Sequence, residues 1–254
     1  MKNIVLGCAL AATLVATAAR GDDVTNSTEA KVYQSPSGGT LPYRFFRTPG
    51  AQGAPLLLFL HGAGERGSNN VAQLKHCLTD FLRYCAEHQQ AITLVAPQCP
   101  VNQAWTARLA PGEVQGLSPE PSAPMAMALE LVDTLVKDPS VDPKRIYISG
   151  ISMGGYGTWD AISRRPEFFA AAMPICGGGD PAQAEKFAKL PIWVFHGAAD
   201  PTVPVERARI MVEALHKAGA KPGVTEYPGV GHDSWSMTYR NPDVLKWMFE
   251  QRRQ

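Results

Sequence analysis

RIYISGISMG, at residues 145–154, has the pattern of a strand that turns sharply into a helix. Its β-branched and aromatic first half favours a strand, and the residues that follow are compatible with a helix. Ser152 lies in the turn, with Gly150 and Gly154 two residues away on either side. An abrupt reversal leaves no room for a Cβ at those two positions, and it exposes the side chain between them. The Ser152 hydroxyl is therefore a candidate nucleophile.

A serine hydroxyl is a poor nucleophile at neutral pH. It becomes reactive only where the protein also supplies a base, an acid that orients the base, and hydrogen-bond donors for the oxyanion. The five-residue motif is short enough to arise by chance. Its functional meaning depends on whether the rest of the chain carries these groups.

Segments with strand and helix character alternate along the chain. Expected strands cover residues 31–34, 40–47, 56–60, 92–96, 146–149, 170–175, 191–195 and 224–227, and expected helices cover residues 71–87, 125–136, 153–165, 205–218 and 243–252. This alternation favours parallel pairing, and continuous apolar strands favour a sheet covered on both faces. We expect an α/β fold: a single domain at residues 30–254 with a doubly wound, mostly parallel sheet, helices on both faces and an N-terminal hairpin.

Residues 97–124 interrupt the alternation, because they contain six prolines, two glycines and the isolated Trp105. A loop of this length is typically functional or disordered. We expect Trp105 and Trp235, which follows the last expected strand, to form a substrate-binding wall, whereas Trp159 falls within a helix and is expected in the core.

The first 18 residues have the composition of a cleaved signal peptide. Lys2 supplies a positive charge, residues 4–19 form an apolar run, and Ala16-Thr17-Ala18 provides an A-x-A cleavage site. The run is too short to span a membrane and no other long apolar run follows, so we expect no stable membrane anchor. We expect a periplasmic or secreted protein, with an N-terminal tail at residues 19–29.

Four cysteines remain after such a cleavage. Cys77 and Cys85 have the spacing of one helix, about 12 Å of rise apart, and cannot bridge each other because disulfide Cα atoms lie within about 7 Å. Export makes disulfides possible, in which case each helical cysteine pairs with Cys99 or Cys176. Free buried thiols are the alternative.

Charge and motif content argue against several functions. The 254 residues include 24 basic and 23 acidic side chains, for a formal net charge of +1 without a basic block, so no nucleic-acid partner is expected. The chain has neither HExxH nor paired CxxC motifs, and we expect no metal.

Two residues that directly follow expected strands can complete a catalytic set with Ser152. Asp200 follows the strand at residues 191–195, and His232 follows the strand at residues 224–227. Ligands bind beyond the carboxyl ends of parallel strands, where these side chains should meet. His232 would then accept the serine proton, and Asp200 would fix the imidazole tautomer and stabilise its cation.

Other residues compete for these roles. His61 and His196 also end strands and are rival bases, although His196 lies only four residues before Asp200. Asp180 follows a strand and is the rival acid.

The expected oxyanion donors are two backbone N–H groups. One belongs to Met153, at the N-terminus of the helix after the serine, where the helix dipole favours negative charge. The other belongs to Ala63, or secondarily Gly64, in the loop after the strand at residues 56–60. We expect Glu65 and Arg66 of this loop to form salt bridges.

The same loop contains G-x-G-x-x-G from Gly62 to Gly67, which is also the dinucleotide-binding fingerprint. That fingerprint requires an acidic residue at the end of the next strand, and Glu87 has the spacing but falls at a helix end. An exported protein is also an unusual place for a dissociable dinucleotide. We therefore expect no cofactor.

Several motifs together resemble a known family. They are LHGAGERG at residues 60–67, VAPQCP at 95–100, ISGISMGGYGTWD at 148–160, PICGGG at 174–179 and HDSW at 232–235. With them the chain resembles the bacterial secreted serine esterases of the α/β-hydrolase superfamily, which are described as phospholipase/carboxylesterase-like. It is also similar to acetyl and feruloyl polysaccharide esterases and to dienelactone hydrolases.

The resemblance implies a triad of Ser152, Asp200 and His232, with the Ala63 and Met153 amides as the oxyanion hole. Dienelactone hydrolases usually carry cysteine as the nucleophile, so the serine favours ordinary ester hydrolysis. We expect a serine esterase that removes short acyl, acetyl or feruloyl groups from a carbohydrate or a small-molecule ester. A prolyl-oligopeptidase-like peptidase and a binding module with a vestigial triad are the alternatives.

Overall fold

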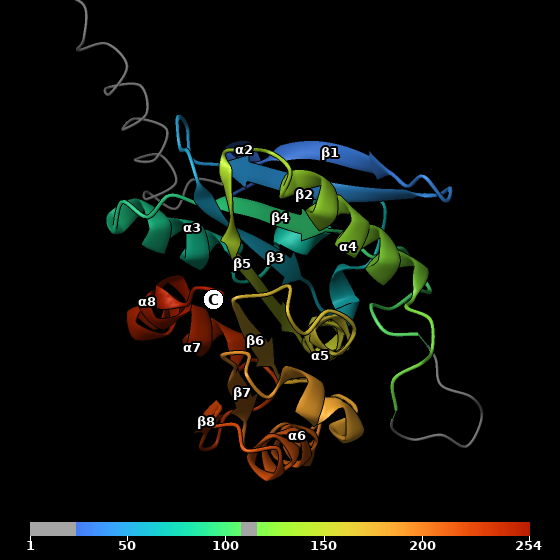
Figure 1. Cartoon of the computed structure of the whole chain (residues 1–254), viewed down its shortest axis with the longest axis vertical. Helices are drawn as coiled ribbons and strands as arrows, with labels where there is room; N and C mark the ends of the chain where they lie inside the picture. The colour runs from blue at the N-terminus through green and yellow to red at the C-terminus, as the bar shows by residue number, and fades with distance from the viewer. Residues whose placement is uncertain (1–23, 108–115) are drawn as a thin grey trace, which may run out of the picture.

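The computed structural model describes residues 24–107 and 116–254, and an eight-stranded sheet lies at its centre (Figure 1). The strands are β1 (Glu29–Gln34), β2 (Thr40–Arg47), β3 (Ala54–Leu60), β4 (Thr93–Pro97), β5 (Val141–Ile151), β6 (Ala171–Ile175), β7 (Trp193–Gly197) and β8 (Gly223–Tyr227). Their order is β1-β2-β4-β3-β5-β6-β7-β8. The β1–β2 and β2–β4 pairs are antiparallel and the other five pairs are parallel. The expected hairpin and mostly parallel sheet are confirmed.

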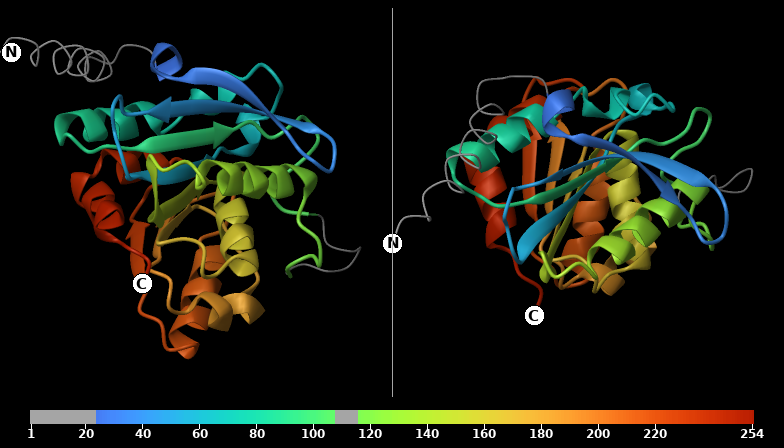
Figure 2. Two further views of the ribbon diagram at one scale, coloured as in Figure 1. Left: turned by 45° about the horizontal axis from the view of Figure 1, so that its top comes forward. Right: turned by 90° about the horizontal axis from the view of Figure 1, so that it is seen from above.

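Helices cover both faces of the sheet (Figure 1, Figure 2). One face carries α4 (Ala123–Leu135), α5 (Met153–Arg164), the 3-10 helix η3 (Pro181–Phe187) and α6 (Glu206–Lys217). The other face carries α2 (Val24–Ser27), α3 (Leu78–Glu87), α7 (Trp235–Arg240) and α8 (Pro242–Glu250). Two short 3-10 helices, η1 (Ala63–Glu65) and η2 (Ala72–Leu74), lie between β3 and α3. The sheet is doubly wound, as expected.

β3 shows why an unbroken apolar run can form a central strand. All seven of its residues are buried. Leu58 and its alternate neighbours pack into the core beneath α4, α5 and α6, whereas Phe59 packs into the core beneath α3, α7 and α8. Successive side chains of a strand point to opposite faces, so a strand buried on both sides has to be apolar throughout.

The expected helix at residues 71–87 is interrupted. Cys77 has a φ of +69°, so a helix cannot pass through it, and α3 begins one residue later. Leu74 keeps its buried position as part of η2 instead. The apolar spacing alone could not distinguish one long helix from a short 3-10 turn followed by a helix. Cys77 and Cys85 therefore do not share one helix, and the four cysteines among the described residues are buried free thiols.

The chain termini differ from expectation at two places. Part of the expected tail at residues 19–29 is packed on the domain: Val24 is buried in the core, and the Arg44 guanidinium donates to the Thr28 carbonyl at 3.0 Å. The expected C-terminal helix is preceded by α7, which the sequence analysis missed. The expected signal peptide at residues 1–18 lies outside the described residues. Within the described ranges, no helix has the length and apolar character needed to cross a membrane.

Candidate active site

Ser152 occupies the turn between β5 and α5 in a strained backbone conformation. Its φ of +53° and ψ of −116° are rare for any residue other than glycine. Two backbone hydrogen bonds hold the turn: the Ser152 N–H donates to the Ile175 carbonyl at 2.9 Å, and the Tyr156 N–H donates to the Ser152 carbonyl at 3.1 Å. The carboxyl end of β5 thus presents Ser152 at the edge where α/β folds bind their ligands.

Two glycines allow this turn to pack closely against β3. A Cβ on Gly150 would lie 2.2 Å from the Gly154 carbonyl oxygen, and a Cβ on Gly154 would lie 1.9 Å from the Leu60 carbonyl oxygen. Both distances are far below van der Waals contact, so a larger residue would force β3 and α5 apart. The steric requirement predicted for these positions is confirmed.

Ser152, His232 and Asp200 form a continuous chain of hydrogen bonds. The Ser152 Oγ lies 2.9 Å from His232 Nε2, and His232 Nδ1 lies 2.7 Å from Asp200 Oδ2. With Asp200 ionised, Nδ1 carries the hydrogen and Nε2 accepts the serine hydroxyl. The His232 side chain is 22% exposed whereas the Asp200 side chain is fully buried. Solvent therefore reaches the imidazole and not the carboxylate at the inner end of this hydrogen-bonded series.

The surroundings of Asp200 keep its carboxyl group ionised. Burial alone would raise its pKa, but hydrogen bonds from His232 and from the N–H groups of Val203 and Thr202 outweigh burial and lower the pKa below its ordinary value. The two N–H groups donate to Oδ1 at 3.0 and 2.8 Å, which leaves Oδ2 for the imidazole. An ionised carboxylate at this position can stabilise an imidazolium that forms on His232.

The loop after β3 lies against the nucleophile. A Cβ on Gly62 would be 3.7 Å from the Ser152 Cβ. Ala63 is the first residue of η1 and Met153 is the first residue of α5, so both N–H groups precede the hydrogen-bond ladders of their helices. Neither N–H has an acceptor within its own helix, which is compatible with the expected oxyanion role, and the dipole of α5 favours negative charge near the Met153 N–H.

Residues 42–241 match the family described as Phospholipase/Carboxylesterase, and the match covers more than half of the chain. The protein belongs to this family. The phospholipase/carboxylesterase assignment agrees with the sheet order, with the turn at Ser152 and with the order of Ser152, Asp200 and His232 along the chain.

Solved structures with the same fold include a thermostable esterase. It is 38% identical with a TM-score of 0.81, over 90% of this chain and 64% of that chain. The feruloyl esterase module from Clostridium thermocellum has a TM-score of 0.64 over 88% of both chains, but at 14% identity it shows the α/β-hydrolase fold alone. Among curated proteins, NocK of Nocardia uniformis subsp. tsuyamanensis is 29% identical over 198 residues, covering 74% of this chain. The match spans 54% of NocK, about half its length.

The rival bases have structural partners of their own. His61 Nδ1 lies 2.6 Å from the Gly62 carbonyl oxygen, its Nε2 accepts the Cys99 N–H at 2.9 Å, and burial lowers its pKa to about 4. His61 is therefore a neutral brace for the loop after β3. His196 Nε2 lies 2.9 Å from the Val203 carbonyl oxygen and 3.4 Å from Asp200 Oδ2, so this ring lies behind the acid.

The rival acid, Asp180, caps a helix. Its carboxylate accepts hydrogen bonds from the Ala182 N–H, from the Gln183 side chain and from the Leu117 N–H. Ala182 and Gln183 lie in the first turn of η3, so this aspartate stabilises that turn and the chain beside it.

The two tryptophans expected to form a substrate wall lie in different surroundings. Trp235 is 9% exposed and packs edge-on against the His232 ring, with centroids 5.3 Å apart and planes at 87°. Trp105 is fully buried, and its indole N–H donates to the His61 carbonyl at 3.0 Å. The expectation of a substrate contact at Trp105 is wrong, because the ring supports the loop after β3 from behind. Trp159 is fully buried, as expected.

Glu65 and Gln98 brace the loop after β3, and the sequence analysis assigned neither residue this role. Glu65 is 5% exposed, with its carboxylate 3.4 Å from His76 Nε2. The Gln98 side chain donates to the Glu65 carbonyl at 3.1 Å and to Asn69 Oδ1 at 2.9 Å. The expected salt bridge of Glu65 thus involves a histidine, whereas Arg66 binds backbone oxygens, among them the Ala63 carbonyl at 2.8 Å.

One group of side chains has the composition of a metal site. Donor atoms of Cys176, Asp200 and His232 lie within 4.8 Å of one another. Burial raises the pKa of the Cys176 thiol to about 12, and metals bind the thiolate. Asp200 and His232 are already hydrogen-bonded to each other, so this cluster suits proton transfer better than metal binding.

Proposed function

We propose that the protein hydrolyses carboxylic esters through an acyl-enzyme intermediate. The observation that carries the proposal is the hydrogen-bonded chain from Ser152 through His232 to the buried Asp200, at the carboxyl edge of the sheet. Membership of the phospholipase/carboxylesterase family and likeness to a thermostable esterase support it.

In the acylation step, Ser152 Oγ attacks the ester carbonyl carbon while His232 Nε2 accepts the hydroxyl proton. The Ala63 and Met153 N–H groups stabilise the oxyanion of the tetrahedral intermediate. The imidazolium then protonates the leaving alkoxide, and the alcohol departs. In the deacylation step, His232 removes a proton from water and the resulting hydroxide attacks the acyl carbonyl. The imidazolium then returns this proton to Ser152 Oγ as the carboxylic acid leaves, which restores the free enzyme.

The proposal extends to short acyl, acetyl or feruloyl groups on carbohydrate, released outside the cytoplasm. The composition of residues 1–18 supports export, and the fold shared with a feruloyl esterase module is compatible with such substrates. Comparing kcat/KM on acetylated xylan, methyl ferulate and a phospholipid tests this extension, and a preference for the phospholipid would contradict it.

Ser152→Ala tests the catalytic proposal directly. We expect turnover of p-nitrophenyl acetate to fall by about 10⁴-fold or more, because the nucleophile is removed while the oxyanion donors remain. A fluorophosphonate should label the wild type stoichiometrically and should not label the variant. Ser37→Ala, in the exposed turn between β1 and β2, is the matched control and should keep wild-type activity.

Wild-type turnover by Ser152→Ala would contradict the proposal. Cleavage of a peptide panel in preference to esters would point to the peptidase alternative. Absence of labelling in the folded wild type would point to a binding module with an unreactive triad.

A further inference from the structure

A cavity of about 220 Å³ opens one helical turn beyond the nucleophile. Tyr156 lies on its wall, and the Tyr156 N–H is the group that donates to the Ser152 carbonyl. Gly178, in the loop after β6, and Arg207, in the first turn of α6, also line the cavity. The cavity thus lies between α5, which begins directly after Ser152, and the N-terminal end of α6.

Gly178 lets Tyr156 and Arg207 approach each other. A Cβ on Gly178 would lie 3.0 Å from the Arg207 Cβ and 3.3 Å from Cε1 of the Tyr156 ring. Both side chains are half-buried. Burial raises the pKa of Tyr156, and the positive charge of Arg207 opposes that rise, which places the guanidinium in the electrostatic reach of the phenol.

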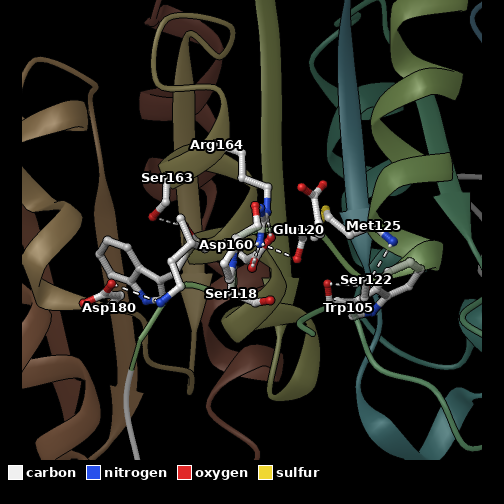
Figure 3. A network of polar contacts seen from close by, with 12 residues as sticks. Trp105, Ser118, Glu120, Ser122, Met125, Asp160, Ser163, Arg164 and Asp180 are labelled. Atoms are coloured by element: carbon white, nitrogen blue, oxygen red, sulfur yellow. Dashed lines mark hydrogen bonds and ion pairs between the residues drawn. The ribbon is translucent and has the colours of Figure 1, made fainter. Parts of the chain in front are cut away.

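The acidic groups around this cavity already have partners. Figure 3 shows Arg164 reaching the Asp160 carboxylate, at 2.6 Å, and the Ser118 carbonyl, at 3.0 Å. Asp180 accepts three hydrogen bonds from its own helix turn and from Leu117. Neither aspartate forms an ion pair with Arg207.

Arg207 lacks such a partner within the described part of the chain. Among residues 24–107 and 116–254, its guanidinium forms neither a hydrogen bond nor an ion pair. Arg209, two residues further along α6, instead pairs with Glu226 at 2.6 Å and Glu206 at 3.1 Å. A guanidinium has five N–H donors whose fork matches the two oxygens of a carboxylate. A half-buried, unpaired guanidinium on a cavity wall is therefore suited to an anionic ligand.

We infer that the ester substrate carries a carboxylate, which Arg207 binds in this cavity while Ser152 attacks the ester carbonyl. The inference rests on the proposed esterase function and names the substrate class of the same site. The Tyr156 hydroxyl is a second donor on the same wall. The Tyr156 N–H lies 3.1 Å from the Ser152 carbonyl oxygen, so we expect a short spacer between the carboxylate and the ester carbonyl.

The carboxylate can belong to the acyl part or to the alcohol part of the ester. Two pairs of small esters separate these cases, each pair differing only in one charge. Monomethyl succinate and methyl succinamate place it on the acyl side, whereas 3-acetoxypropionate and 3-acetoxypropionamide place it on the alcohol side; in each pair a neutral amide replaces the carboxylate and one ester bond remains. Acid release in a pH-stat measures kcat/KM for all four.

We expect the anionic member of at least one pair to have a kcat/KM about tenfold higher than its neutral counterpart. This is the gain that one hydrogen bond to a charged group typically provides. Arg207→Gln should remove this preference and leave the neutral member within about twofold of the wild type. Arg207→Lys should retain part of the preference, because it keeps the charge and loses the fork. Arg209→Gln, on the same helix, is the matched control and should leave both members unchanged.

A preference for the neutral esters in both pairs would overturn the inference. The inference would also be overturned if Arg207→Gln and Arg207→Lys, with wild-type melting temperatures, lose kcat/KM equally on charged and neutral esters. If the anionic and the neutral member of each pair have equal kcat/KM, this inference fails and the esterase proposal still stands. A wild type that neither hydrolyses any of the four esters nor reacts with a fluorophosphonate would remove both.

Discussion

Ser152 combines backbone strain with a reactive side chain. A non-glycine residue at φ +53° costs of order 1–3 kcal/mol, and the hydrogen bonds to Ile175 and Tyr156 hold it there. In return, the hydroxyl projects from the end of β5 and lies 2.9 Å from His232. The strain is thus located where it orients the nucleophile.

His232 is held from two directions. Asp200 fixes the imidazole through Nδ1, and the edge-on ring of Trp235 limits its rotation. Trp235 also packs against the His76 ring, whose Nε2 lies 3.4 Å from the Glu65 carboxylate. The rings therefore connect the loop after β3 to the base.

Replacing Trp235 with a smaller residue should reduce turnover, because His232 would lose the ring that packs against it. We expect Trp235→Ala to lower kcat on p-nitrophenyl acetate by about tenfold to a hundredfold with little change in KM, because a displaced base costs transition-state alignment. Trp235→Phe keeps an aromatic edge and should retain most of the activity. Trp247→Phe, on α8 away from the site, is the control. A change in KM alone would indicate a substrate contact instead.

The catalytic groups belong to elements that meet at one edge of the sheet. Ser152 joins β5 to α5, Asp200 follows β7 and His232 follows β8. The loop after β3 completes the site, and its bracing residues include His61, Gln98 and Glu65, on either side of α3. No single element carries the site, so its geometry depends on the register of the parallel strands.

Asp138 links β2 to the segment just before β5, and its contacts predict a pH dependence of stability. Its carboxylate accepts hydrogen bonds from Ser140, just before β5, and pairs with Arg47 of β2 at 2.8 Å. These contacts, those of Ser140 first, lower the Asp138 pKa from 3.8 to about 2. A depressed folded-state pKa stabilises the fold above the unfolded value, and this contribution is lost as the pH falls from about 4 to 2.

Asp138→Asn should therefore lower Tm by about 1–2 °C at pH 7, since the contacts are partly exposed. The difference from the wild type should shrink as the pH approaches 2. Differential scanning calorimetry at several pH values measures it, with Glu29→Gln, at a mostly exposed carboxylate, as the control. A difference that stays constant across that range would contradict the assignment.

At the scale of the molecule, two core layers share one sheet. The layer beneath α4, α5 and α6 contains Trp105 and Trp159, and the layer beneath α3, α7 and α8 contains Trp235. Alternate residues of β3 belong to opposite layers. The layers therefore depend on each other for stability.

Removing side chains from either layer should destabilise the whole domain. We expect Leu58→Ala to cost about 2–5 kcal/mol and Phe59→Ala about 3–5 kcal/mol. Urea unfolding followed by tryptophan fluorescence and by circular dichroism should give one coincident transition that shifts in both variants. Val32→Ala, at an exposed position of β1, is the control. Two separate transitions, of which one variant shifts only one, would contradict a shared core.

The amino-acid sequence by itself determined the alternation of strands and helices, apart from α7 and the break at Cys77, together with the turn at Ser152 and the choice of Asp200 and His232. Apolar periodicity and glycine sterics are local properties, and residues that follow parallel strands meet at one edge whatever the details of packing. The same reasoning predicted that Trp159 is in the core.

Only the tertiary structure decided what surrounds the triad. In the folded chain Trp105 is buried in the core, and His61 and His196 support neighbouring segments. The helix expected through Cys77 is interrupted there, and Arg207 lies beside a cavity. These outcomes depend on which distant segments share the available space and hydrogen-bond partners. Ring orientation, burial and pairing of a charge are set by such contacts, and the order of residues along the chain does not specify them.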